Sequence, residues 1–171
     1  MTLPHKTVLL AEEIIQKASE QGMTISTAES CTGGLVSAAL TSVPGSSAVL
    51  DRAFVTYSNK AKMQMLSVPS DIIRQHGAVS GETARAMVCG ALNASPADLA
   101  VSITGIAGPG GGSVEKPVGL VWFGFAERGH PARTERHIFA NGDRDFVRNQ
   151  ATITALSFLL KALSPGEAKN Q

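Results

Sequence analysis

The stretch "MTISTAESCTGGLVSAALTS", residues 23–42, decides the fold. Residues 23–28 predict a short buried strand, and "LVSAALTS" has the spacing of a helix that stops at Pro44. Two adjacent glycines separate the two patterns. The stretch therefore predicts a strand, a tight loop and a helix in that order, with Ser30 and Cys31 side by side in the loop.

Helical and strand patterns alternate on both sides of this stretch. Gly22 is a stop signal for the first helix, Ser80 caps a later one, and Asn141 or Asp143 caps the last. The expected helices span 6–20, 35–42, 61–66, 80–95 and 143–163, and the expected strands span 23–28, 49–58, 97–105, 116–127 and 132–140. Because the last two strands resemble a hairpin, we predict an α/β fold: a three-layer α/β/α sandwich around a mixed, mostly parallel sheet of about five strands.

The composition limits the classes of function. The chain has 171 residues, of which 43% are hydrophobic, so we expect residues 1–171 to form a single domain with a proper core. The formal net charge is +1 and no cluster of Lys and Arg is present, which argues against a general nucleic-acid binder. Aromatic residues, at 5%, offer few surfaces on which single-stranded bases could stack.

The beginning of the chain, "MTLPHKTVLLAEEIIQK", has neither the apolar core nor the cleavage site of a signal peptide. No apolar run approaches the ~18 residues that a membrane span needs. Cys31 and Cys89 are the two cysteines, and without a secretion signal we expect them to stay reduced. The sequence therefore predicts a cytoplasmic protein without a membrane partner.

Chemically interesting residues gather where the expected strands end. "ESCTGG", "TYSNKAK" and "SITGIAGPGGG" each follow a strand, and "NGDRDFVR" precedes the last helix. In open α/β sheets, ligands bind beyond the strand ends, where loops converge and helix N-termini present free N–H groups. This edge of the sheet is the expected binding site.

Ser30 is a candidate nucleophile. At a turn between a strand and a helix, its hydroxyl could attack a substrate carbonyl, while the N–H groups of Thr32, Gly33 or Gly34 form an oxyanion hole. The alternative is structural: Ser30 or Thr32 caps the helix, and the glycines allow close packing. The motif alone leaves both open.

A nucleophilic serine needs a base, and none of the four histidines in the sequence offers an obvious one. Lys60 and Lys62 are the alternative, on a short helix after Tyr57. A Ser–Lys pair assisted by tyrosine is a known catalytic arrangement. The competing interpretation is a solvated helix face, which is the more common place for lysine.

Several motifs together resemble the CinA C-terminal domain family. "TAESCTGG", "GSSAVLDRAFVTYSNKAK", "HGAVS", "SITGIAGPGGGSVEKPVG" and "GDRDFVRNQAT" occur in the family's order and spacing, over about residues 7–163. Members made of this domain alone resemble nicotinamide-nucleotide amidohydrolases, which convert nicotinamide mononucleotide to nicotinate mononucleotide and ammonia. Larger members carry a further N-terminal domain, for which we expect no room in this chain.

The resemblance also implies roles for individual residues. It makes Ser30 the nucleophile, Lys62 the base, and Tyr57, as a further catalytic residue, together with Ser47 the hydroxyls that help to place the substrate and the lysine. Thr104 and Arg144 match further active-site positions that bind the substrate. Arg144 and the glycine loop 108–112, with Gly110 at its centre, suit either a phosphate or a developing negative charge. The family usually has an acid where this chain has Lys60, which we do not expect to act as the base.

The implied reaction is a hydrolysis of a small nucleotide without a cofactor, and no short-spaced set of metal ligands is present in the sequence. Because compact enzymes commonly form closed oligomers, and the last helix is apolar, we expect a homo-oligomer, most simply a dimer. Two alternatives remain: a non-catalytic module that binds a nucleotide or a partner, and an amidohydrolase of another small amide.

Overall fold

The computed structural model describes residues 3–164. Its helices are α1 (His5–Gln21), α2 (Leu35–Thr41), α3 (Asn59–Leu66), α4 (Ser70–His76), α5 (Gly81–Asn93) and α6 (Arg144–Leu163), with a short 3-10 helix η1 (Ser46–Ala48). Its strands are β1 (Ile25–Glu29), β2 (Leu50–Val55), β3 (Leu99–Gly105), β4 (Leu120–Glu127) and β5 (Arg133–Ile138). The segment 164–171, which follows the last predicted helix and for which the sequence predicts a frayed tail, lies outside the described residues except for Ser164.

The strands form one sheet in the order β2-β1-β3-β4-β5. β1 pairs in parallel with β2 and β3, whereas β4 runs antiparallel to both β3 and β5. β1 is buried at every position, as expected for a central strand that is covered on both faces. The prediction of a mixed, mostly parallel sheet is confirmed.

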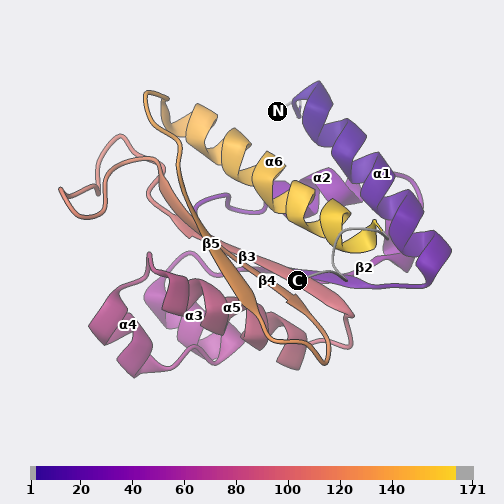
Figure 1. Ribbon diagram of the computed structural model, residues 1–171, viewed down its shortest axis with the longest axis horizontal. Helices are drawn as coiled ribbons and strands as arrows, with labels where there is room; N and C mark the ends of the chain where they lie inside the picture. The colour runs from indigo at the N-terminus through magenta and orange to yellow at the C-terminus, as the bar shows by residue number, and fades with distance from the viewer. Residues whose placement is uncertain (1–2, 165–171) are drawn as a thin grey trace.

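Helices cover both faces of the sheet (Figure 1). α1, α2 and α6 pack together on one face, over a core that includes Ile14, Val36 and Leu159. α5 covers the other face, with α3 and α4 packed against it, over a smaller core around Leu66 and Met87. This arrangement is the predicted three-layer α/β/α sandwich.

The helix stop and cap residues predicted from the sequence mark helix ends in the structure. Gly22 ends α1 in the left-handed conformation, with φ of 64°, and its N–H donates to Ala18. The side chain of Ser80 accepts a hydrogen bond from the N–H of Thr83 at the start of α5. Asp143 caps α6 in the same way, so of the two predicted caps for this helix Asp143 is the one used.

Several elements differ from the sequence prediction: η1 was not predicted, and β2 ends at Val55 rather than at 58. Helix α4 was not predicted, because its seven residues between Pro69 and Gly77 are too short to show a helical period. Strand β4 begins at Leu120 rather than at 116. The reason is Gly119, which has φ of 91° and lies so close to the carbonyl oxygen of Phe139 that a Cβ there would collide with it.

Within residues 3–164, no helix is long and apolar enough to cross a membrane.

Candidate active site

Strands β1, β2 and β3 end at the same edge of the sheet and bring distant residues into one cavity. The cavity has a volume of about 290 Å³ and is lined by Ser30, Tyr57, Lys62, Thr104, Gly110 and Arg144, among others. Ser30 directly follows β1, and Tyr57 follows β2. The predicted gathering of functional side chains at this edge is what the parallel part of the sheet produces.

Ser30 and Lys62 are in direct contact. Lys62 Nζ lies 3.0 Å from Ser30 Oγ and donates a hydrogen bond of 2.8 Å to the carbonyl oxygen of Thr56. Lys62 is 1% exposed, and this burial lowers the pKa of its amine from the usual range. Helix α3 positions the lysine, and the helix starts where Ser58 accepts a hydrogen bond from the N–H of Ala61.

The partners of Lys62 Nζ suit a neutral amine. Both are uncharged: the Thr56 carbonyl, which takes one N–H, and the Ser30 hydroxyl. When the amine is neutral, its lone pair can accept the hydroxyl proton of Ser30 at the observed distance. The geometry therefore allows Lys62 to act as a general base toward Ser30.

Tyr57 and Arg144 form the rim of the cavity. One guanidinium nitrogen of Arg144 donates to the Tyr57 hydroxyl at 3.0 Å, and another donates to the carbonyl oxygen of Gly108 at 2.8 Å. Tyr57 is 62% exposed, so the pair lies at the mouth rather than at the bottom. Arg144 thus ties the beginning of α6 to the glycine loop and leaves a cation at the opening of the site.

A buried carboxylate holds the loop that carries Ser30. Glu29 is 0% exposed, and its two carboxylate oxygens accept hydrogen bonds from the backbone N–H groups of Gly34, Val36 and Ser37. These are the first N–H groups of α2, which a negative charge stabilises. The N-terminus of α2 is therefore already occupied by the protein's own anion.

A cation holds the same loop from the other side. Arg148 on α6 donates hydrogen bonds to the carbonyl oxygens of Cys31 and Thr32, at 3.2 and 3.1 Å. Gly33, with φ of 62°, faces this guanidinium. The nucleophile loop is thus fixed between a carboxylate on its N–H groups and a guanidinium on its carbonyl groups.

Two of the three N–H groups that the sequence suggested for an oxyanion hole already donate hydrogen bonds within the protein. The N–H of Gly33 donates to the Ser30 carbonyl, and the N–H of Gly34 donates to Glu29, so both amides are engaged within the protein. Thr32 is 0% exposed and does not line the cavity. Cys31, by contrast, lines it.

Ser47 lies away from the cavity. It belongs to η1, which precedes β2, whereas Tyr57 follows β2, so the length of the strand separates the two. Thr104 does line the cavity, and its hydroxyl donates to the carbonyl oxygen of Ala78 at 2.7 Å. The structure therefore assembles Ser30, Tyr57, Lys62, Thr104, Gly110 and Arg144, and leaves Thr32, Gly33, Gly34 and Ser47 outside the lining.

Cys31 is next to Ser30 in the sequence but lies in a different environment. Its side chain is 6% exposed, and burial raises the pKa of the thiol to about 12. A thiol with such a pKa is not a thiolate at neutral pH and is a poor nucleophile. Of the two neighbours, Ser30 is the one with a base in contact.

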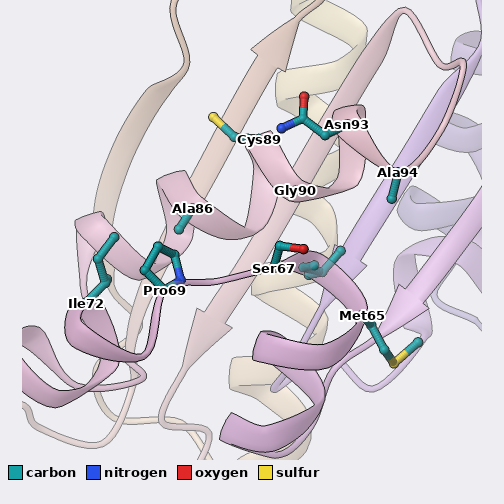
Figure 2. Close-up of a pocket in the computed structure, with 10 residues that line it drawn as sticks. Met65, Ser67, Pro69, Ile72, Ala86, Cys89, Gly90, Asn93 and Ala94 are labelled. Atoms are coloured by element: carbon teal, nitrogen blue, oxygen red, sulfur yellow. The ribbon is translucent and has the colours of Figure 1, made fainter.

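A second cavity of about 440 Å³ lies among α3, α4 and α5 (Figure 2). Most residues that line it are apolar, such as Met65 and Ile72. Asn93 and Cys89 are among the other lining residues. It contains neither Ser30 nor Lys62. Among the residues that the structure describes, no group of three or more His, Cys, Asp or Glu side chains could hold a metal ion.

Sequence reasoning missed Glu29, Arg148 and the carbonyl of Thr56. Glu29 precedes Leu35, the first residue of α2, by six residues, outside the usual capping spacing, and Arg148 is more than a hundred residues from the loop it contacts. A backbone carbonyl leaves no trace in a sequence. Only the placement of Glu29 directly before Ser30 could have drawn attention to it.

Comparison with known protein families identifies the family of this chain. The model of the CinA C-terminal domain matches residues 8–163. This chain belongs to the CinA C-terminal domain family. A curated relative from Escherichia coli K12, nicotinamide-nucleotide amidohydrolase PncC, is 54% identical over 150 residues, which are 88% of this chain and 90% of the relative.

Longer proteins share the CinA C-terminal domain. The CinA-like protein of Citrifermentans bemidjiense is 53% identical over 144 residues, which cover 84% of this chain but 34% of that protein. Among solved structures, competence/damage inducible protein CihA of Agrobacterium tumefaciens has a TM-score of 0.92 and 47% identity, over 95% of this chain and 98% of the other. The fold described above is thus the fold of this family.

Proposed function

We propose that this protein is a nicotinamide-nucleotide amidohydrolase of the cytoplasm, which hydrolyses the carboxamide of nicotinamide mononucleotide through an acyl-enzyme on Ser30. The observation that carries the proposal is the buried contact of 3.0 Å between Ser30 Oγ and Lys62 Nζ. It occurs in a chain that is 54% identical to a relative named for this activity. The products are nicotinate mononucleotide and ammonia.

In the first half of the reaction, Ser30 Oγ attacks the carboxamide carbon while Lys62 Nζ accepts the hydroxyl proton. The tetrahedral intermediate collapses when its C–N bond breaks and the Lys62 ammonium returns that proton to the leaving nitrogen, which departs as ammonia. In the second half, Lys62 takes a proton from water, and the resulting hydroxide attacks the ester carbon. The C–O bond to Ser30 breaks, and Ser30 Oγ receives the proton from Lys62.

The rim of the cavity supplies groups for the rest of the nucleotide. Arg144 is the cation at the mouth, and Gly110 and Gly111 line the wall beside it. A guanidinium and a glycine-rich backbone are suited to phosphate oxygens. We assign the phosphate to this end of the cavity and the carboxamide to the end that holds Ser30.

The test is release of ammonia from nicotinamide mononucleotide by the purified protein and two variants. Ser30→Ala should lose nearly all turnover, because it removes the attacking oxygen, whereas Cys31→Ser should keep most of it. If Cys31→Ser were inactive and Ser30→Ala active, the assignment of the nucleophile would be wrong.

The same assay separates the alternative functions. No ammonia from the unaltered protein, together with tight binding of the nucleotide, would indicate a non-catalytic binding module. Release of ammonia from other small amides but not from the nucleotide would indicate a different amidohydrolase.

A further inference from the structure

Lys116 joins the two walls of the cavity. Its Nζ donates a hydrogen bond of 2.6 Å to the carbonyl oxygen of His76, forty residues away in the sequence. His76 is the last residue of α4, and Ala78 and Val79, which follow it, line one wall. Lys116 belongs to the glycine-rich segment 106–119, which supplies the opposite wall.

The position of the ammonium group has a physical reason. The carbonyl groups at the C-terminus of a helix carry partial negative charge and accept hydrogen bonds from cations. Gly77 ends α4 with φ of 77°, and a Cβ at this position would lie 3.1 Å from Lys116 Nζ. A glycine here thus leaves room for the lysine to approach the helix end.

Hydrogen bonds within the segment 106–119 hold its two ends together and fix the turn at residues 113–116. At the base, the N–H of Ile106 donates to Leu120, and the N–H of Gly119 donates to Ile106. Near the tip, the N–H of Ser113 donates to the Lys116 carbonyl, and the Ser113 hydroxyl accepts from the Lys116 N–H. These bonds present the Lys116 side chain to α4.

The wall formed by residues 76–79 is held in place by hydrogen bonds that do not involve Lys116. The carbonyl of Gly77 accepts hydrogen bonds from the hydroxyls of Ser80 and Thr83, and the carbonyl of Ala78 accepts from Thr104. Within residues 3–164, the bond from Lys116 to His76 is the one hydrogen bond that connects the segment 108–117 to residues 76–79. Loss of that bond would release the segment 108–117 from the C-terminus of α4, while Arg144 would still hold Gly108 from α6 and residues 76–79 would stay in place.

We propose that Lys116 is a positioning residue that holds the glycine segment closed against the C-terminus of α4 and thereby sets the affinity of the cavity for its substrate. The effect on substrate affinity rests on the proposed function, whereas the effect on the glycine segment does not. Ser30 and Lys62 are held by β1 and α3, so the chemical step does not depend on this contact. Removing the ammonium should therefore weaken substrate binding and leave catalysis of the bound substrate intact.

The first test is the kinetics of Lys116→Met, which keeps most of the apolar stem, on nicotinamide mononucleotide. Loss of one charge-assisted hydrogen bond predicts that KM rises about tenfold, while kcat changes less than about twofold. Lys116→Arg keeps a cationic donor and should restore most of the affinity. Lys161→Met, at the exposed far end of α6, is the matched control and should behave like the unaltered protein.

The second test does not depend on activity. Hydrogen exchange followed by mass spectrometry should show faster exchange in peptides from 106–119 of Lys116→Met, with exchange in 80–93 unchanged. Unchanged exchange in 106–119, or a fall in kcat at constant KM, would overturn the role of Lys116. If the unaltered protein does not hydrolyse the nucleotide at all, the proposed function fails, and the exchange result alone decides whether Lys116 holds the segment.

Discussion

The burial of Lys62 governs the chemistry of the site. An amine that is 1% exposed and bonded to a carbonyl and a hydroxyl loses its proton more readily than a lysine in water, because burial disfavours the charged form. Its pKa is lowered from the ordinary range, so a larger fraction of the amine is neutral near neutral pH. A base of this kind needs no histidine.

We predict that Lys62→Arg is as damaging as Lys62→Ala, with kcat reduced by about a hundredfold or more. Arginine keeps the positive charge but does not give up a proton in proteins. In the unaltered protein, kcat/KM should rise with pH through an apparent pKa below that of an ordinary lysine, ~10.4. Substantial turnover by Lys62→Arg would show that the charge alone matters and that another group takes the proton.

Lys62 also links stability to pH. Since its folded pKa is lowered, the unfolded chain binds more protons than the folded one between the two pKa values, and the free energy of unfolding rises with pH across that interval. We predict that the unaltered protein gains stability relative to Lys62→Met as the pH rises from the lowered folded pKa toward the pKa of an ordinary lysine, ~10.4. Urea unfolding of both proteins at several pH values measures this difference. A difference that stays constant with pH would mean that the amine titrates alike in both states.

At the scale of elements, the start of α2 depends on Glu29. Its carboxylate accepts three backbone N–H groups, and glutamine offers one oxygen and an NH₂ group that would face the same donors. We predict that Glu29→Gln lowers the free energy of unfolding by about 2–4 kcal/mol. Chemical denaturation measures it, with Glu13→Gln on the exposed face of α1 as the control. Equal stability of the two variants would contradict the role of Glu29.

The same element shows where sequence reasoning succeeds and fails. The strand, loop and helix of residues 23–42 could be predicted because glycines and apolar spacing are local signals. The oxyanion donors could not, because the use of an N–H depends on whether Glu29 or Ser30 reaches it in space. Ser47 was carried over from a resemblance between sequences, and its role stays a prediction, because the length of β2 separates it from the cavity within one chain.

For the whole molecule, the expected homodimer needs a different argument from the one that the sequence offered. Most apolar side chains of helix α6 pack against α1, α2 and the sheet, so they are already used within the chain. Exposed apolar side chains occur instead at Val55, the last residue of edge strand β2, and at Tyr57 and Met63, which follow it in the sequence. We take these three side chains as a candidate association patch, because exposed apolar side chains next to an edge strand favour association.

We predict a dimer by light scattering at assay concentrations, with Met63→Lys shifting the mass toward the monomer by placing a charge in this patch. Leu9→Lys, at an exposed position on α1, is the control and should leave the mass unchanged. A monomeric mass for the unaltered protein would refute the prediction.

The contrast between the two cysteines has a practical consequence. Cys89 is exposed on α5, while Cys31 is buried and its pKa is raised to about 12. Maleimides and alkylating reagents react with thiolates, so at neutral pH they should modify Cys89 and spare Cys31. The natural chain can therefore carry one fluorophore or spin label on α5 without any engineering, and the loop that bears Ser30 stays chemically untouched.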